Sequence, residues 1–256
     1  MELGLSGKVA LVTGGSSGIG RAVAIAFGRE QAKVAITYRT NSQAAEATVG
    51  RIREAGGEGI AVYMDLADEA SIKAAHAAVL DRWGQIDALI ANAIHWGADA
   101  PNPGRQIEDV PMSEWRAMVD INLVGTVATI QAVLPAMRQQ GWGRIVLVSS
   151  DVVDEPVPGT AHYASAKGGL HGMFPALVGE LGPAGIGVNI VQPGLTTTEK
   201  NLERMPQAVR DMVAARVPTR RLSTPEDVAA AIVFLASPVA RNITGETLKV
   251  NGGWSW

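Results

Sequence analysis

Short apolar runs recur along the chain, separated by longer stretches in which apolar residues have helical spacing. Several runs are continuous rather than alternating, as in strands buried on both faces of a parallel sheet. The runs that we interpret as strands are Val9–Val12, Val34–Thr37, Gly59–Tyr63, Ala88–Ala91, Ile145–Val148, Val188–Val191 and Thr247–Val250. The stretches that we interpret as helices are Gly20–Arg29, Ala44–Ala55, Glu69–Trp83, Ser113–Gln139, Ala161–Leu181 and Pro225–Leu235.

The alternation of strands and helices predicts a doubly wound α/β fold, with a mainly parallel seven-stranded sheet and helices on both faces. Three polar residues stand where helices should begin: Asp68, Ser113 and Thr224, the last followed by proline. The sequence contains no internal repeat, low-complexity tract or linker. We therefore interpret residues 1–256 as a single domain.

Composition narrows the classes of function. The chain has 256 residues and a net charge of −3 without a basic block, which disfavours nucleic acids and membranes as partners. It contains no cysteine, and its four histidines show no ligand spacing, so thiol chemistry is excluded and we expect no metal site. We expect that no apolar run reaches membrane-spanning length, and the N-terminus does not resemble a signal peptide. We expect a cytoplasmic protein.

A glycine-rich loop, Thr13-Gly14-Gly15-Ser16-Ser17-Gly18-Ile19-Gly20-Arg21, follows the first predicted strand. It opens a helix, whose free N–H groups and partial positive charge favour a pyrophosphate. An ordinary glycine turn is the alternative, but dinucleotide-binding folds carry such a loop at this first junction. A kinase-type phosphate loop is disfavoured, because Arg21-Ala22 stands where Lys and Ser/Thr would be needed.

Tyr163 and Lys167 lie four residues apart in a predicted helix and therefore share one face. A neighbouring ammonium favours the phenolate, so we expect Lys167 to lower the pKa of Tyr163 from about 10 toward neutrality. Ser150 follows a predicted strand and can supply a hydroxyl to the crevice at the carboxyl ends of the strands. A surface helix turn would explain Tyr-x-x-x-Lys alone, but not its combination with Ser150 and the glycine loop.

Together these motifs resemble the short-chain dehydrogenase/reductase family in its compact Rossmann form, over nearly the whole chain. Thr13-Gly14-x-x-x-Gly18-x-Gly20 is similar to the family's cofactor loop, and Ser150, Tyr163 and Lys167 are similar to its catalytic residues. Further similar features are the helix asparagine Asn122, the turn Pro193-Gly194, and the C-terminal patterns Ile243-Thr244-Gly245 and Val250-Asn251-Gly252-Gly253.

The resemblance implies hydride transfer between a nicotinamide and a carbonyl carbon. Tyr163 would exchange the proton on oxygen, Lys167 would bias Tyr163 and bind the nicotinamide ribose, and Ser150 would steady the substrate oxygen. Asn122 would join Lys167 to a chain of water molecules. The implied cofactor-binding residues are Gly14, Ser16, Ser17, Gly18, Ile19, Gly20, Arg39, Thr40, Asp65, Leu66, Asn92, Ala93, Tyr163, Lys167, Pro193, Gly194, Thr196 and Thr198.

The end of the second predicted strand indicates which cofactor is used. NAD-binding folds carry an acid there for the ribose 2′-hydroxyl, whereas this chain reads Thr37-Tyr38-Arg39-Thr40-Asn41. Arg39 can pair with a 2′-phosphate through its planar fork, so we expect NADP(H), with NAD(H) less favoured. A solvated arginine at a strand end is the alternative, and Ser17 stands where many NADPH-using relatives carry a basic residue.

Two departures from the family pattern affect the site. Ile94 in Ala91-Asn92-Ala93-Ile94 replaces a glycine that lies close to the cofactor in the family, which puts the local geometry in doubt. The stretch after Ser150 carries Asp151, Asp154 and Glu155 near the expected entrance. For Asp151 and Asp154 we favour turn capping. We expect the acids to disfavour strongly anionic carriers of the substrate.

We therefore expect reduction of a ketone to a secondary alcohol, with β-ketoacyl compounds among the candidates; a catalytically silent nucleotide sensor is the alternative. Residues 199–216 are predicted to form a lid, or else an ordinary surface helix. Trp96, Met205 and the loop Gly97–Val110 suggest a partly apolar pocket. The apolar helix Ser113–Gln139 and the glycines Gly168, Gly169 and Gly172 predict helix pairing between subunits, and the family resemblance points to a homotetramer.

Overall fold

The computed structural model describes residues 2–97 and 104–255. Residues 98–103, part of the loop expected to line the substrate pocket, lie outside the described residues. Seven strands form one sheet in the order β3-β2-β1-β4-β5-β6-β7, and every neighbouring pair is parallel. The predicted doubly wound fold is confirmed. The strands are β1 (Val9–Val12), β2 (Lys33–Tyr38), β3 (Glu58–Tyr63), β4 (Ala88–Ala91), β5 (Gly143–Val148), β6 (Ile186–Pro193) and β7 (Thr247–Val250).

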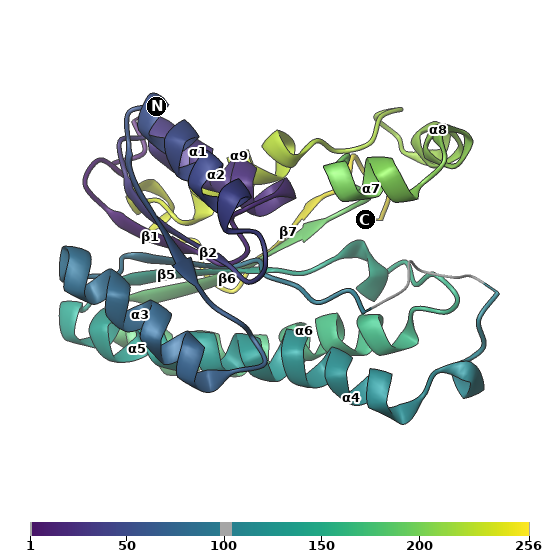
Figure 1. Cartoon of the computed structure of the whole chain (residues 1–256), viewed down its shortest axis with the longest axis horizontal. Helices are drawn as coiled ribbons and strands as arrows, with labels where there is room; N and C mark the ends of the chain where they lie inside the picture. Colours follow the sequence, from purple (N-terminus) through teal and green to yellow (C-terminus); the bar gives the residue numbers. More distant parts are fainter. Residues whose placement is uncertain (1, 98–103, 256) are drawn as a thin grey trace.

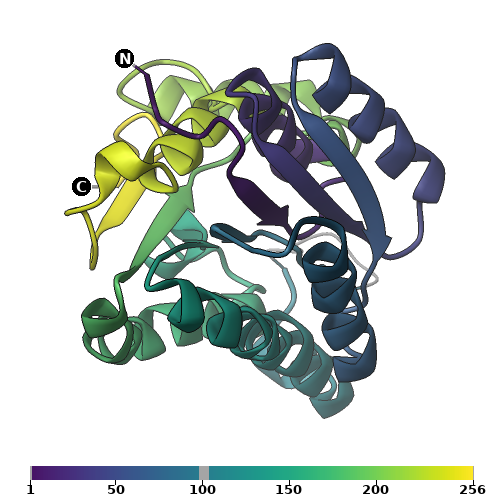
Figure 2. The ribbon, with the colours of Figure 1, turned by 90° about the vertical axis from the view of Figure 1, so that its left-hand side faces the viewer.

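Helices cover both faces of the sheet and make three layers (Figures 1 and 2). One face carries α1 (Gly18–Arg29), α2 (Ser42–Glu54) and α9 (Pro225–Leu235). The other face carries α3 (Glu69–Trp83), α4 (Met112–Val119), α5 (Gly125–Gln140) and α6 (Ala161–Leu181). Two further helices, α7 (Glu199–Arg204) and α8 (Gln207–Arg216), follow β6. Short 3-10 turns are η1 (Ile107–Asp109), η3 (Asp151–Val153), η4 (Gly182–Ala184) and η5 (Pro238–Ala240).

The apolar residues of the strands divide between two cores. In β1, Val12 belongs to the core on one face of the sheet, together with Phe27 from α1 and Ile232 from α9. Leu11 packs toward the opposite layer, which includes Ile130 from α5. All four residues of β1 are at most 1% exposed. The continuous apolar runs therefore reflect a sheet covered on both faces.

Two of the three predicted helix caps are confirmed. The Asp68 side chain accepts a hydrogen bond from the N–H of Ala70 at the start of α3, and Thr224 forms a capping box with Asp227 at the start of α9. The prediction for Ser113 is wrong, because α4 already begins at Met112 and Pro111 is the residue before it. Pro111 has a φ of −58°, close to the value that its ring imposes.

A π-helical turn, η2 (Asp120–Val124), joins α4 and α5. The N–H of Gly125 donates to the carbonyl of Asp120, five residues earlier, so the turn holds one residue more than an α-helix would. Gly125 then passes so close to the end of β3 that a Cβ atom there would lie 2.4 Å from the carbonyl oxygen of Leu66. This turn places Asn122, which is 2% exposed, against the interior.

The helical run Met112–Gln140 has the length and mean hydropathy of a membrane-spanning segment, contrary to our expectation that no segment would. Length and composition are weak evidence for a membrane, because core helices of soluble proteins have the same properties. In this fold Ile130, Val133 and Met137 of α5 pack into the core against the sheet. The hydropathy of the helix is therefore explained in part by its burial.

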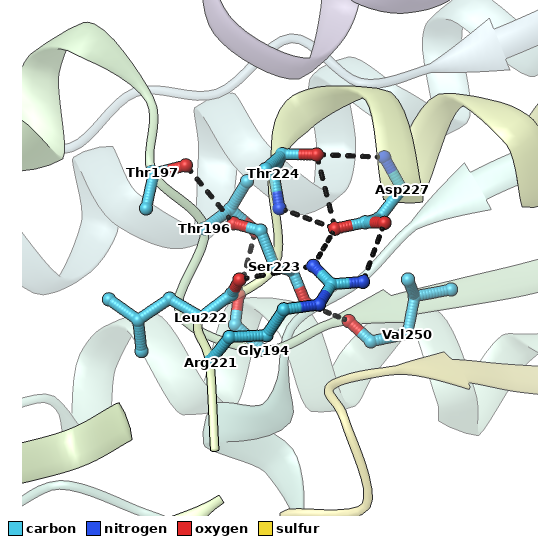
Figure 3. A network of polar contacts seen from close by, with 9 residues as sticks. All are labelled: Gly194, Thr196, Thr197, Arg221, Leu222, Ser223, Thr224, Asp227 and Val250. Atoms are coloured by element: carbon cyan, nitrogen blue, oxygen red, sulfur yellow. Dashed lines mark hydrogen bonds and ion pairs between the residues drawn. The ribbon is translucent and has the colours of Figure 1, made fainter. Parts of the chain in front are cut away.

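The segment of α7 and α8 is attached at its base to the start of α9 (Figure 3). Thr196 and Ser223 form an isolated parallel bridge, and the N–H of Thr197 donates to the carbonyl of Ser223 at 2.9 Å. The Ser223 hydroxyl donates to the carbonyl of Val250 at 3.1 Å, which links the base to β7. Arg221 pairs with Asp227 through both of its terminal nitrogens, at 2.5 and 3.0 Å. The base is thus fixed to the sheet and to α9.

Candidate active site

The glycine loop joins β1 to α1 and is held against the end of β4. The Thr13 hydroxyl accepts hydrogen bonds from the N–H groups of Asn92 and Ala93, at 2.9 and 2.8 Å. The Asn92 side chain donates in return to the carbonyl of Thr13 at 2.9 Å. These bonds bring together two stretches about 80 residues apart in sequence, and they explain why polar residues follow both strands.

Two glycines of this loop are required by its geometry. Gly14 has a φ of +66°, which side-chain-bearing residues rarely adopt. At Gly20 a Cβ atom would lie 2.3 Å from the carbonyl oxygen of Gly14, so only glycine allows the loop to fold back on α1. The Ser17 side chain does not cap α1, and the first turn contains no acid. The loop is therefore a close-packed cradle at a helix start that Ser17 leaves uncapped, which fits a dinucleotide pyrophosphate.

Ser150, Tyr163 and Lys167 meet beyond the carboxyl end of β5. Ser150 directly precedes η3, while Tyr163 and Lys167 lie one turn apart on α6. Ser150 forms a side-chain hydrogen bond with Tyr163. The Lys167 ammonium donates to the carbonyl of Val148 at 2.6 Å. Tyr163 and Lys167 are 6% and 4% exposed, so both ionisable groups are taken from water.

Burial dominates the acid–base properties of this pair. It raises the pKa of the Tyr163 phenol, and the hydrogen bond with Ser150 lowers that pKa only in part. Our expectation that Lys167 moves the pKa of Tyr163 toward neutrality is therefore wrong for the free chain, because desolvation of the phenolate has the largest effect on that pKa. Burial also lowers the pKa of Lys167 to about 8, from 10.5.

The buried ammonium predicts a dependence of stability on pH. The folded pKa of Lys167 is about 8 and its ordinary value is 10.5, so between these values the unfolded chain binds the additional proton. Stability from this group therefore rises with pH across that interval, by about 1.4 kcal/mol per pH unit, and is flat below it. Urea unfolding at several pH values should show the wild type gaining on Lys167→Met only above about pH 8. A difference that stays constant with pH would contradict the assigned pKa.

Asn122 holds the segment that follows β4. Its side-chain oxygen accepts a hydrogen bond from the backbone N–H of His95 at 2.7 Å, and its side-chain NH2 group donates to the backbone carbonyl of His95 at 2.8 Å. The amide also contacts the sulfur of Met118. Asn122 thus faces the interior of the protein. The side chain of Asn122 is fully used by the backbone N–H and carbonyl of His95, so only the backbone carbonyl of Asn122 remains for the expected link to water. The Thr126 hydroxyl also donates a hydrogen bond to that backbone carbonyl.

A small apolar cluster surrounds the Tyr163 ring. Ile94, Trp96 and Met118 are part of it, and the rings of Trp96 and Tyr163 lie 4.6 Å apart with a tilt of 30°. The Ile94 side chain, which replaces the glycine of the family pattern, packs against this cluster. Trp96 supplies the apolar wall that we expected near the site.

Basic side chains from separate elements of the chain lie near one another where β2 ends. Arg39 is exposed there, as is Thr40. The charge of Arg39 lowers the pKa values of both His95 and Lys200, after burial as the main cause, so the three groups are close. Lys200 belongs to α7 and Arg204 also acts on its pKa. We did not identify Lys200 from the sequence, because no local motif marks it.

Three further predicted cofactor residues, Thr198, Thr196 and Asp65, use their side chains within the protein. Thr198 lies beside the loop, because its methyl carbon would be 3.2 Å from a Cβ atom on Gly18, although its hydroxyl caps α7 through Asn201. Thr196 is 3% exposed and donates to the carbonyl of Gly194, so its hydroxyl stabilises the Pro193-Gly194 turn rather than facing a ligand. The Asp65 side chain accepts a hydrogen bond from the N–H of Ala67, so it caps the turn that follows β3.

The acids after Ser150 are bound to distant parts of the chain. Asp151 is 8% exposed and accepts hydrogen bonds from Gln192 and Asn251, and burial raises its pKa. Asp154 pairs with Lys249 at 2.8 Å, and that ammonium holds the Asp154 pKa below its usual range. Turn capping by these two side chains is therefore wrong. Asp154 and Glu155 are both exposed, and the ion pair with Lys249 offsets the charge of Asp154.

Known proteins resemble the chain along nearly its whole length. A family model described as enoyl-(acyl carrier protein) reductase matches residues 14–255. The chain is 33% identical over 250 residues to glucose 1-dehydrogenase 2 of Bacillus subtilis (strain 168), covering 97% of this chain and 95% of that protein. It is 36% identical over 252 residues to the 3-oxoacyl-(acyl-carrier-protein) reductase of Synechocystis sp., covering 97% of each.

Solved structures agree with this relationship. A putative short-chain alcohol dehydrogenase from Sinorhizobium meliloti 1021 superposes with a TM-score of 0.90 at 30% identity, covering 99% of this chain and 98% of that one. An NADH-dependent reductase responsible for alginate metabolism, A1-R′, superposes with a TM-score of 0.87 at 28% identity, covering 98% of each. With the glycine loop and the Ser150–Tyr163–Lys167 arrangement, these matches show that the chain belongs to the short-chain dehydrogenase/reductase family of oxidoreductases.

Proposed function

We propose that this oxidoreductase uses NADPH to reduce a ketone on a partly apolar molecule to a secondary alcohol. The observation that carries the proposal is the meeting of Ser150, Tyr163 and Lys167 beside Trp96, at the end of the sheet that also carries the glycine loop. The silent nucleotide sensor remains the alternative, and the complete set of proton-handling groups argues against it.

The described residues fit a nicotinamide dinucleotide. The cradle of Gly14, Gly18 and Gly20 would hold its pyrophosphate, and the turn Pro193-Gly194 would lie on the nicotinamide side. Ser16, Ser17, Ile19, Leu66, Asn92 and Ala93 complete the proposed binding surface along the loop and the ends of β3 and β4. When bound, the cofactor supplies a hydride at nicotinamide carbon 4.

Each catalytic side chain has a defined task in this proposal. Tyr163 donates the proton that the substrate oxygen gains during reduction. Ser150 donates a hydrogen bond to the same oxygen as negative charge develops on it. Lys167 is buried, which lowers the pKa of its ammonium group to about 8. The ammonium therefore gives up its proton readily and can return a proton to the phenol. Asn122 positions His95 and the chain after β4, and thereby the wall of the site.

The cations at the end of β2 support NADPH as the cofactor. Arg39 is exposed, no acid follows β2 directly, and Lys200 adds a second positive group nearby. A 2′-phosphate would be attracted to this pair, whereas a ribose hydroxyl would gain little from it. The structural relative described as NADH-dependent shows that the fold also accommodates the other cofactor.

The substrate is proposed from the surroundings of Tyr163 and from the relatives. Trp96, Ile94 and Met118 make the proton donor's surroundings apolar, and Leu202, Val209 and Met212 are exposed on the helices of the proposed lid, 199–216. Two relatives act, by their names, on 3-oxoacyl groups and glucose. A β-ketoacyl thioester is one candidate, and the pairing of Asp154 with Lys249 removes much of our earlier objection to anionic carriers.

We expect the protein to assemble as a homotetramer. Val124 is 51% exposed on the long apolar helix, and a Cβ atom on Gly168 or Gly172 of α6 would meet nothing within 4 Å. Gly169 is explained inside the chain, because its Cβ would lie 2.5 Å from Leu123. Light scattering at micromolar concentration should give four times the chain mass of 26.7 kDa. A monomeric mass would contradict the proposed pairing of these faces.

A screen with identified products tests the proposed function. The purified protein is mixed with NADPH or NADH and a panel of ketones that includes β-ketoacyl thioesters. In the reverse direction it is mixed with NADP+ or NAD+ and a panel of sugars as alcohol substrates. Formation of a secondary alcohol, with greater efficiency for NADPH, is the expected result. Tight dinucleotide binding without turnover of any member would favour the sensor. We also propose that the protein acts in the cytoplasm, as expected from its sequence.

A further inference from the structure

Helix α7 touches the glycine loop through an acidic side chain. The Glu199 carboxylate forms an ion pair with Arg21 of α1 and accepts a hydrogen bond from the N–H of Gly18 at 3.3 Å. Thr198, directly before it, packs against the same loop, with its methyl carbon 3.2 Å from the position of a Cβ atom on Gly18. The start of α7 therefore lies on the first turn of α1.

This carboxylate occupies the part of the loop that suits a phosphate. Uncapped N–H groups at a helix start attract anions, and Ser17 supplies no cap of its own here. A bound pyrophosphate would need the same kind of donor that Gly18 gives to Glu199. Two anions sharing one donor repel each other, so both cannot be held there at once.

We propose that Glu199 is an internal competitor for the pyrophosphate seat, so that dinucleotide binding must displace α7 from the glycine loop. This inference rests on the proposed function, because it takes the loop as the cofactor site. Displacement frees Arg21 to face the phosphates and moves Lys200, the next residue of α7, relative to Arg39 at the adenosine end. Cofactor binding is thereby coupled to the position of the helices at residues 199–216.

The attachment of the segment suits such a movement. At its base Thr197 donates to the carbonyl of Ser223, as Figure 3 shows, and Thr196 pairs with Ser223 in an isolated parallel bridge. At its far end the N–H of Thr219 donates to the carbonyl of Gly252. Between these anchors α7 and α8 bury no residue fully. The contact of Glu199 with the loop can therefore break without unfolding the base.

The test compares the dinucleotide affinities of the wild type, Glu199→Gln and the matched control Glu203→Gln. Glu203 is exposed on the same short helix, so its change alters the net charge equally. Titration calorimetry with NADPH, without any substrate, gives the dissociation constants. If the carboxylate competes, Glu199→Gln should bind NADPH about three- to tenfold more tightly, while Glu203→Gln stays close to the wild type. Glu199→Asp, with a shorter reach, should fall between.

Hydrogen exchange gives a second readout that does not depend on activity. Without dinucleotide, residues 199–204 should exchange faster in Glu199→Gln than in the wild type, and NADPH should speed their exchange in the wild type. Unchanged or weaker NADPH binding by a folded Glu199→Gln would overturn the inference, since the ion pair would then be neutral or would secure bound cofactor. If the wild type binds no dinucleotide at all, the proposed function fails instead.

Discussion

Replacing Tyr163 with phenylalanine should lower turnover by about a hundredfold or more while leaving dinucleotide affinity nearly unchanged. The phenylalanine ring keeps the packing with Trp96 and Ile94, so only the hydroxyl is lost. That hydroxyl forms a hydrogen bond with Ser150 and is the proposed source of the substrate's proton. Steady-state kinetics with a ketone and calorimetry with NADPH measure the two quantities separately.

Tyr63→Phe is the matched control for this prediction, because the chain has only three tyrosines and Tyr63 is 50% exposed on β3. Its activity should equal that of the wild type. Near-normal turnover by Tyr163→Phe would remove this residue from the mechanism. A large loss of NADPH affinity together with turnover would instead assign the hydroxyl to binding.

Arg39→Ala should weaken the use of NADPH by about ten- to a hundredfold, because a charge-assisted contact contributes about 1.5–3 kcal/mol. Use of NADH should hardly change, since NADH has no phosphate at that place. The neighbouring Lys200 would retain part of the attraction, which favours the lower end of this range. The ratio of kcat/KM for the two cofactors, measured with one substrate, checks the prediction.

Arg51→Ala on α2 serves as a control for the loss of an exposed positive charge. It should leave the cofactor ratio unchanged. Equal losses with NADPH and NADH in Arg39→Ala would show that Arg39 acts on the fold or on the shared part of the cofactor. A wild-type preference for NADH would also contradict the assignment.

The order of strands and helices could be predicted because burial on both faces leaves a direct signal in the sequence. Runs such as Val9–Val12 have no polar residue, and the structure shows them covered on each side. The helix start at Thr224 was predictable for a similar reason, because a cap and its partner lie within four residues. Local rules failed at Ser113, where Pro111 sets an earlier start.

Features that depend on distant contacts could not be predicted. Asp151 and Asp154 look like turn residues, but their partners Gln192, Lys249 and Asn251 lie 38 to 100 residues away. The π turn at Asn122 leaves no clear pattern in a helix that is apolar on most sides. The contact of Glu199 with the glycine loop joins residues 181 apart, so only the fold reveals it.

The pKa of Tyr163 shows a limit of spacing arguments. The four-residue interval correctly placed Tyr163 and Lys167 one turn apart on α6. It did not reveal that both groups are buried, which raises the pKa of the phenol and lowers that of the ammonium. Proximity alone therefore does not make the phenol acidic in the free chain. The energetic balance depends on how much water each group has lost.

Transfer of deuterium from labelled cofactor tests the central claim most directly. NADPH that carries deuterium at nicotinamide carbon 4 is incubated with the best ketone of the panel, and the alcohol is examined by mass spectrometry and NMR. Our account predicts deuterium on the carbinol carbon, from one face of the nicotinamide only, with transfer nearly abolished in Tyr163→Phe. Dinucleotide binding without deuterium in any product would contradict it and identify the protein as a sensor.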